Sequence, residues 1–255
     1  MKNIQIKFLG AFVISFLCVA NSICESQSSS SFNFKIINGA PASTKGSPIG
    51  LVITKDFFGR TGICSGSLIG PTAVLTAWHC VDQVSRNNIR VKFGEKFFSL
   101  SSFYIHPKIK IGKQDGFLYN DLAILRLRRK PRGVKQIPLL TSVKTSPGAK
   151  ISIAGYGRDQ FGKIGVLNVG TATIAAVTRD HFITHFTGIS SNTCNGDSGG
   201  PALAKNKNNR LGLIGTTSFG TVLSCGLGDT SFYINLQSSS AISFIKKRAL
   251  GVVFN

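Results

Sequence analysis

Short apolar runs recur along the chain from about residue 50 onward, and Gly, Pro and Ser separate them. Several runs alternate apolar and polar residues, as in Ile89-Arg-Val-Lys-Phe93. This alternation is typical of half-buried strands, and many short strands with turn signals between them predict an all-β sandwich or barrel. The expected strands include Gly50–Thr54, Ala73–Thr76, Ile89–Phe93, Leu122–Leu127, Ile151–Ala154, Phe182–Phe186, Leu211–Thr216 and Ser231–Leu236.

A helical period is first seen near the C-terminus. Ser238–Ser240 can cap a helix, and apolar residues from Ala241 to Leu250 then fall on one face. This pattern predicts a helix over 240–250. The sequence has no phosphate-binding glycine loop and no Cys/His set with zinc spacing, so no cofactor and no metal are expected.

The first 35 residues have the pattern of a targeting and processing segment. Two lysines in Met1–Lys7 precede an apolar run, Phe8–Ala20, which is shorter than the roughly 20 residues that a membrane span needs. We predict a signal peptide over 1–22, no transmembrane anchor, and secretion to an extracellular or periplasmic location. A buried N-terminal helix is the alternative. The Ser-rich stretch 23–35 is expected to be a pro-segment.

Composition narrows the possible functions. The chain has 255 residues, of which 42% are hydrophobic, so it can form a core and wholesale disorder is excluded. Ten acidic residues are too few for most carboxylate-rich metal sites. The formal charge is +20, without a run of five like charges, so the positive charge is spread along the chain. Such a surface attracts polyanions.

The densest cluster of small residues is Gly196-Asp-Ser-Gly-Gly-Pro201. Glycines on both sides leave the hydroxyl of Ser198 open to a substrate. The pattern also fits the nucleophile elbow of an α/β-hydrolase, but that chain order needs a histidine after the serine. All four histidines precede Ser198, so that order is excluded. A plain Gly-rich turn remains the alternative.

A serine nucleophile needs a base near pH 7. His79 is the best candidate because it ends an apolar stretch, next to Cys80. His106 precedes a proline and is expected in a loop, whereas His181 and His185 are expected to be packed or surface groups of a strand.

The base needs an acid to orient it. Asp121 opens an apolar strand, so it should be partly buried, and a buried charge needs partners. Asp115 is expected in a turn, and Asp82 is too close to His79 in sequence. The chain order of the candidates is then His79, Asp121, Ser198.

Six segments in this order carry a resemblance to a known family. The chain resembles the trypsin/chymotrypsin-like secreted serine proteases over 36–255. The matching segments are Ile36–Gly39, Cys64–Leu68, Leu75–Cys80, Asn120–Leu125, Cys194–Pro201 and Ser218–Gly220. The resemblance implies two six-stranded antiparallel β-barrels, divided near 130–150, with the active site between them and a C-terminal helix.

The resemblance also implies the chemistry. Ser198 would attack the peptide carbonyl, His79 would move the proton, and Asp121 would orient His79. The N–H groups of Gly196 and Ser198 would form the oxyanion hole. Disulfides Cys64–Cys80 and Cys194–Cys225 are expected, whereas Cys24 has no partner in the mature chain.

In this family, cleavage of a pro-segment creates an α-amino group that pairs with an aspartate. The matching positions are Ile36, which follows Lys35, and Asp197. The chain is therefore expected to be a zymogen that is activated by cleavage between Lys35 and Ile36.

Substrate contacts are expected from the pocket and from one strand. The neutral Asn192 fills the pocket-base position and, with an open pocket completed by Thr193, Gly220 and Ser231, predicts large neutral or polar P1 side chains. The strand Ser218-Phe219-Gly220 would pair with the substrate backbone. Because a pocket for neutral or polar P1 side chains would not accept lysine well, a separate Lys-specific protease would be needed to cleave after Lys35.

We therefore expect a monomeric serine endopeptidase that acts on polypeptides and binds no specific nucleic acid. Two alternatives stay open. One is a catalytically weak or inactive protein of the same fold that binds polyanions non-specifically through its basic surface, since Trp78 stands beside His79 where alanine is usual. The other is an esterase or transferase with the same three residues.

Overall fold

Strands dominate the part of the chain that the computed structural model describes, which is residues 36–255. The predicted signal peptide, the pro-segment and Cys24 lie outside the described residues. One α-helix, α1 (Ser239–Arg248), and two 3-10 turns (Trp78–Cys80 and Arg86–Asn88) complete the described elements. The strands are β1 (Ala40–Pro41), β2 (Ile49–Lys55), β3 (Thr61–Leu68), β4 (Ala73–Thr76), β5 (Ile89–Phe93), β6 (Lys96–Ile105), β7 (Lys110–Ile111), β8 (Leu118–Tyr119), β9 (Ala123–Leu127), β10 (Lys150–Gly155), β11 (Asn168–Val177), β12 (His181–His185), β13 (Pro201–Lys205), β14 (Leu211–Gly220) and β15 (Thr230–Asn235).

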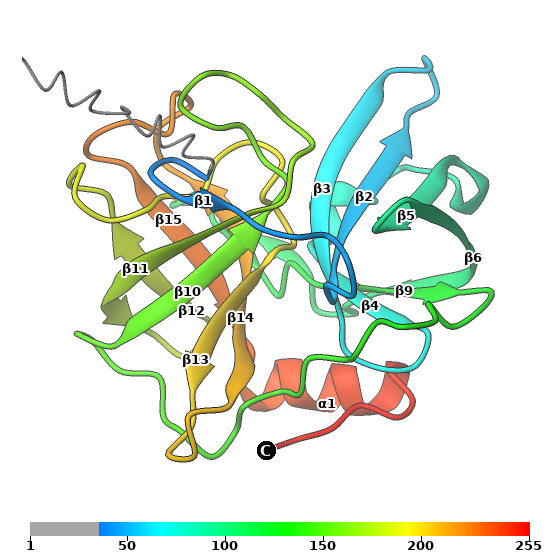
Figure 1. The fold of residues 1–255 in the computed structure, drawn as a ribbon. Helices are drawn as coiled ribbons and strands as arrows, with labels where there is room; N and C mark the ends of the chain where they lie inside the picture. The colour runs from blue at the N-terminus through cyan, green and yellow to red at the C-terminus, as the bar shows by residue number, and fades with distance from the viewer. Residues whose placement is uncertain (1–35) are drawn as a thin grey trace, which may run out of the picture. The chain divides into compact units, whose positions relative to one another are not determined.

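The first barrel closes in the order β2-β3-β4-β9-β6-β5, with every pair antiparallel (Figure 1). In β5, Ile89, Val91 and Phe93 are buried while Arg90 is exposed, as the alternation predicts. The interior is an apolar cluster that includes Val52, Leu68, Val74, Phe98 and Leu125.

The second barrel contains β10 to β15. These strands follow the order β11-β10-β13-β14-β15-β12, and an additional pairing of β11 with β12 closes the ring. The short β1 adds to the free side of β11. The interior of the second barrel includes Ile153, Ile174, Phe182, Ile214 and Tyr233. The structure thus confirms the expected fold of two six-stranded antiparallel barrels.

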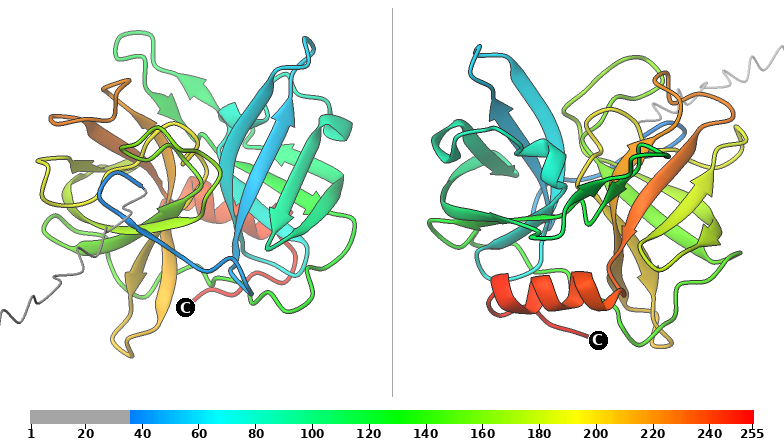
Figure 2. Two further views of the ribbon diagram at one scale, coloured as in Figure 1. Left: turned by 45° about the horizontal axis from the view of Figure 1, so that its top comes forward. Right: turned by 180° about the vertical axis from the view of Figure 1, so that it is seen from behind.

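A third apolar cluster joins the two barrels to α1. It unites Leu75 and Ile124 of the first barrel with Leu213 and Ile234 of the second, and with Ile245 of the helix. Full burial of such a side chain stabilises the fold by about 1.5–3 kcal/mol. The cluster therefore holds the two barrels in one fixed arrangement, which Figure 2 shows from two further sides.

The helix α1 confirms the predicted C-terminal helix, with ends one to two residues from the expected 240–250. The Ser238 hydroxyl accepts a hydrogen bond from the backbone N–H of Ala241 at 3.2 Å, as an N-cap does. Lys246, Lys247 and Arg248 occupy the last turn, where positive charge is favourable. Within residues 36–255, no helix is long and apolar enough to cross a membrane.

Candidate active site

His79 lies in the 3-10 turn that follows β4. The strand covers Ala73–Thr76, as predicted, so His79 lies three residues beyond the strand and not at its end. Two connections fix the turn. The disulfide Cys64–Cys80 joins it to β3, and the backbone N–H of His79 donates to Asp121 Oδ1 at 3.0 Å.

Asp121 lies two residues before β9 and is fully buried, where the sequence predicted partial burial. Its Oδ2 accepts hydrogen bonds from His79 Nδ1 at 2.8 Å and from Ser218 Oγ at 2.5 Å. Burial alone raises the pKa of Asp121, but the hydrogen bonds from His79 and Ser218 outweigh it and hold the pKa below its ordinary value. The carboxylate is therefore charged and points at the imidazole.

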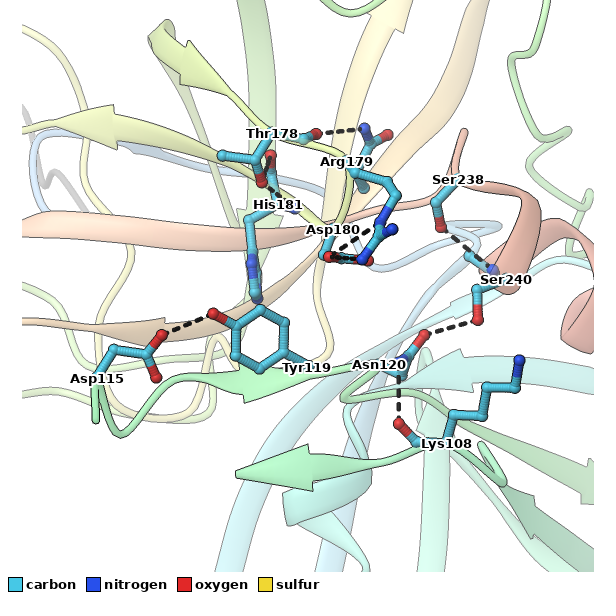
Figure 3. A network of polar contacts seen from close by, with 12 residues as sticks. Lys108, Asp115, Tyr119, Asn120, Thr178, Arg179, Asp180, His181, Ser238 and Ser240 are labelled. Atoms are coloured by element: carbon cyan, nitrogen blue, oxygen red, sulfur yellow. Dashed lines mark hydrogen bonds and ion pairs between the residues drawn. The ribbon is translucent and has the colours of Figure 1, made fainter. Parts of the chain in front are cut away.

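The neighbouring Asn120 anchors the segment that delivers Asp121. Asn120 has a left-handed backbone (φ 53°), and its Nδ2 donates to the carbonyl of Lys108 at 2.9 Å. Its Oδ1 accepts from Ser240 Oγ of α1, also at 2.9 Å (Figure 3). Asparagine tolerates this backbone conformation better than most residues. The helix thus supports the position of Asp121.

Ser198 lies in the loop before β13, across the cavity from His79. Its carbonyl accepts a hydrogen bond from the backbone N–H of Ser65 at 2.8 Å, which ties this loop of the second barrel to the first. Its Oγ donates to the carbonyl of Ser218 at 3.5 Å and forms no hydrogen bond with His79. Catalytic hydrogen bonds are often long without a substrate.

Glycines make the close approach of the Ser198 loop possible. Gly199 has φ 80°, and a Cβ there would collide with Thr76 Oγ1 and the carbonyl of Ser65. Gly196 has φ 99°, and its Cβ would lie 2.9 Å from the Cα of Gly157. A side chain at Gly199 would push the loop away from the first barrel, and one at Gly196 would push it away from the segment that follows β10.

His79 and Ser198 open onto one cavity of about 400 Å³. Four of the six predicted substrate-binding residues line it, namely Thr193, Ser218, Phe219 and Gly220. The cavity is also lined by Leu118, Cys194, Asn195, Thr217, Val222, Leu223, Cys225 and Asp229. The other two predicted residues, Asn192 and Ser231, do not line the cavity.

Asn192 and Ser231 lie fully buried in a polar cluster behind the cavity wall. Ser231 Oγ donates to Asn192 Oδ1 at 2.8 Å and is 2.7 Å from Thr193 Oγ1. Asn192 Nδ2 donates to Asp229 Oδ2 at 2.8 Å. The neutral residue at the expected pocket base thus holds a carboxylate that does line the cavity.

Asp229 is the residue that sequence reasoning missed. Its other oxygen, Oδ1, accepts from the N–H groups of Thr221 and Val222 at 2.8 and 2.9 Å. Only 1% of Asp229 is exposed. The sequence offered one weak sign that Asp229 could reach the cavity. Asp229 lies four residues after Cys225, in the segment that the disulfide Cys194–Cys225 attaches to the cavity wall. That signal is weak because no motif surrounds the aspartate.

Asp197 is fully buried and does not line the cavity, although its neighbours Asn195 and Ser198 do. Its carboxylate accepts backbone hydrogen bonds from Gly157 at 2.8 Å and Cys194 at 2.9 Å. Burial raises the pKa of Asp197 to about 7, against the opposing effect of these two bonds. No cationic side chain of residues 36–255 forms an ion pair with it.

Ile36 packs fully buried in the core of the second barrel, with φ 56°. The next residue, Ile37, accepts a hydrogen bond from the backbone N–H of Asn192 at 3.0 Å. The start of the described chain is therefore bound to the segment that leads to Asp197.

Both expected disulfides, Cys64–Cys80 and Cys194–Cys225, are formed. In the described part of the chain, one close group of potential metal ligands occurs, Cys64, His79 and Cys80. Its two sulfurs are bonded to each other, so they cannot bind a metal as thiolates.

His106, His181 and His185 lie away from the serine. His106 is buried against α1, and His181 donates from Nε2 to the carbonyl of Leu118 at 2.7 Å. Burial lowers the pKa of both side chains. His185 is exposed on β12. His79 is thus the histidine that shares a cavity with Ser198.

Comparison with known proteins agrees with this geometry. The trypsin family model matches residues 36–243. Serine protease SP24D of Anopheles gambiae is 29% identical over 220 residues, covering 80% of this chain and 78% of that protein. Fibrinolytic enzyme isozyme C of Lumbricus rubellus is 30% identical, over 65% of this chain and 78% of that protein. Venom serine protease 34 of Apis mellifera is 25% identical over 64% of this chain, which spans about half (47%) of the bee protein. This chain belongs to the trypsin family of serine proteases.

Proposed function

We propose that the chain is a secreted serine endopeptidase that hydrolyses peptide bonds through an acyl-enzyme. The observation that carries the proposal is the hydrogen bond between the buried Asp121 and His79, together with the cavity that His79 and Ser198 both line. Because Asp121 binds the Nδ1–H of His79, the neutral imidazole leaves Nε2 free to take the proton of Ser198. The same proton then passes to the leaving amine.

The oxyanion hole in this mechanism is formed by the backbone N–H groups of Gly196 and Ser198. It stabilises the negative charge that develops on the carbonyl oxygen, and one such donor contributes about 2.7–4 kcal/mol to transition-state stabilisation. The substrate lies along Ser218, Phe219 and Gly220, which form one side of the cavity.

We further propose that the chain is a zymogen. Asp197 is a buried carboxylate with two backbone donors and a raised pKa, which is the setting in which a cation is most stabilising. Cleavage between Lys35 and Ile36 would supply that cation as a new α-amino group. The hydrogen bond from the backbone N–H of Asn192 to the carbonyl of Ile37 supports this proposal, because it holds the residue after the new terminus against the segment that leads to Asp197.

A labelling experiment tests catalysis and activation together. The purified chain is treated with a fluorophosphonate probe before and after brief cleavage with trypsin, and its N-terminus is sequenced. We expect labelling only in the sample that begins at Ile36, and none in the Ser198→Ala variant. Labelling of a sample that still carries residues before Ile36, at the level of the cleaved sample, would retain the enzyme and contradict the zymogen. A folded chain that begins at Ile36 and takes no label would contradict the catalytic proposal.

We propose that the pocket prefers Lys or Arg at P1, in place of the neutral side chains expected from Asn192. The carboxylate of Asp229 supports this preference, since it lines the cavity and no cationic side chain of the described residues pairs with it. Basic P1 side chains would gain a charge partner there. Lys35 then meets the preference, so the chain can cleave its own pro-segment without a separate activating protease.

A further inference from the structure

A second group of charged residues lies on the first barrel, apart from the active site. Six of the ten residues in 126–135 are Lys or Arg, and none is acidic. Three of them, Arg129, Lys130 and Arg132, line a surface cavity of about 700 Å³ together with Lys96 and Phe98. We call this cavity the basic hollow. It shares no residue with the cavity around Ser198.

The walls of the basic hollow belong to the barrel framework. Lys96 and Phe98 lie in β6, and the segment 128–132 follows β9, the neighbour of β6 in the barrel (Figure 1). The N–H of Arg128 donates to the carbonyl of Ser99 at 3.0 Å, which extends this pairing past the end of β9. Strand pairing therefore brings the backbone of segment 128–132 close to that of Lys96 and Phe98.

Phe98 forms an apolar floor that holds one of the cations in place. The Arg129 guanidinium carbon is 5.3 Å from the centre of the Phe98 ring, within the range of a cation–π contact. Phe98 itself is only 5% exposed, whereas Lys96, Arg129, Lys130 and Arg132 are all exposed. The guanidinium of Arg129 is thus partly ordered before any ligand binds, which reduces the entropy lost on binding.

No carboxylate lines the basic hollow. Glu95 is adjacent in sequence, but its side chain binds Lys92 at 2.9 Å. Residues 36–255 contain nine acidic side chains, of which Asp121, Asp159, Asp197 and Asp229 are buried and contribute little to the surface. The four cations of the hollow therefore repel one another without an internal counter-charge, and a bound polyanion would relieve that repulsion.

We propose that the basic hollow is a binding site for a sulfated glycan. Arginine guanidinium groups present planar pairs of N–H donors that match the oxygens of a sulfate group. Single-stranded nucleic acid usually needs open aromatic faces on which bases stack. The one aromatic ring of the hollow is buried and packed against Arg129, so the chemistry favours sulfated sugars.

The test measures the affinity of a heparin octasaccharide for the purified chain, with Ser198→Ala as background to prevent proteolysis. The variant Lys130→Gln/Arg132→Gln should bind at least about 10-fold more weakly at 150 mM salt. It should also lower the slope of log affinity against log salt by about two, because two ionic contacts are lost. The matched control, Lys205→Gln/Lys207→Gln, removes the same charge from exposed positions around the β13–β14 turn. It should change the affinity by less than about twofold.

Two outcomes would overturn the proposal. Equal weakening in both double variants would mean that net charge alone binds the glycan. Tighter binding of a single-stranded DNA of equal charge, with the same dependence on Lys130 and Arg132, would assign the hollow to nucleic acid. Lys96→Gln provides a third variant on the opposite wall, and unchanged thermal unfolding of each variant shows that the fold is intact.

Discussion

The two barrels have the same number of strands and an apolar core each, but they differ in the polar groups that are buried around the proposed pocket. The core cluster of the first barrel is formed by apolar side chains and the half-cystine Cys80. The second barrel has an apolar core of its own, but its loops bury Asn192, Asp197 and Asp229, and its strand β15 buries Ser231, all with exposures of 0–1%. Such groups are stable only because each is hydrogen-bonded. The first barrel thus provides a rigid support, and the second carries the polar groups that the proposed pocket and activation need.

The proposed catalytic geometry depends on contacts between the barrels. Asp121 comes from the first barrel, yet one of its donors, Ser218, comes from the second. We therefore expect that substitutions in either barrel can abolish catalysis. Substrate selectivity and activation should instead respond to substitutions in the second barrel.

The largest expected effect is that of Asp121→Asn. The amide can present its Nδ2 to His79, which stabilises the wrong imidazole tautomer, so kcat should fall about 10⁴-fold. Ser198→Ala is the control for background hydrolysis. Steady-state kinetics on a peptide substrate, with unchanged thermal unfolding of the variant, measures the effect. A loss of less than about tenfold would mean that His79 does not act through Asp121.

The second effect concerns the raised pKa of Asp197 in the uncleaved chain. When a carboxyl has a pKa of about 7 in the folded state and 3.8 in the unfolded state, ionisation favours unfolding. Stability is then full below pH 4 and falls as the pH rises to about 7, by at most about 4 kcal/mol. Thermal unfolding of the Ser198→Ala chain across this range should show the fall.

Two comparisons check the assignment to Asp197. In Asp197→Asn the fall in stability between pH 4 and 7 should largely disappear, although the absolute stability changes because an amide cannot accept both backbone bonds. In the chain cleaved after Lys35, the new amino group should also remove most of the fall. An identical pH profile in all three forms would contradict the role of Asp197.

The sequence predicted the first barrel and the proposed catalytic residues better than the pocket. Alternating residues such as those of Ile89–Phe93 report burial directly, because adjacent side chains of a strand face opposite sides. The candidates His79, Asp121 and Ser198 were recognisable because each lies within a short motif. The motif around His79 did not reveal the 3-10 turn that follows β4, since this turn is fixed by distant contacts to Cys64 and Asp121.

The pocket was predicted less well because long-range pairing decides which side chains face it. Position in the chain suggested Asn192 and Ser231, but Ser231 pairs with Gly220 of β14 and lies behind the wall. Asp229 has no motif of its own, and its orientation follows from hydrogen bonds to Thr221 and Val222 across a loop. Such contacts are not encoded in local periodicity.

The third prediction tests whether the apolar core of the first barrel supports the whole molecule. Leu125→Ala removes a fully buried side chain and should lower the free energy of unfolding by about 3 kcal/mol. Because a shared cluster joins the barrels, we expect one unfolding transition at a lower denaturant concentration. Two separated transitions would show that the barrels unfold independently.

The smallest expected effect is a change of selectivity confined to the second barrel. Asp229→Asn keeps an oxygen that can accept from Thr221 and Val222, but it removes the charge and the acceptor of Asn192 Nδ2. The ratio of kcat/KM for P1 Lys to kcat/KM for P1 Gln should therefore fall about 100-fold, while the value for P1 Gln changes little. Asp180→Asn is the matched control, since it removes one negative charge from the second barrel at a position that lies outside the cavity. If Asp229→Asn weakened cleavage of both substrates equally, Asp229 would only brace the loop 221–229. A fall in the ratio alone would make the Asp229 carboxylate the partner of the P1 side chain. Selectivity would then depend on a buried charge of the second barrel, separately from the His79–Asp121 geometry that the first barrel holds.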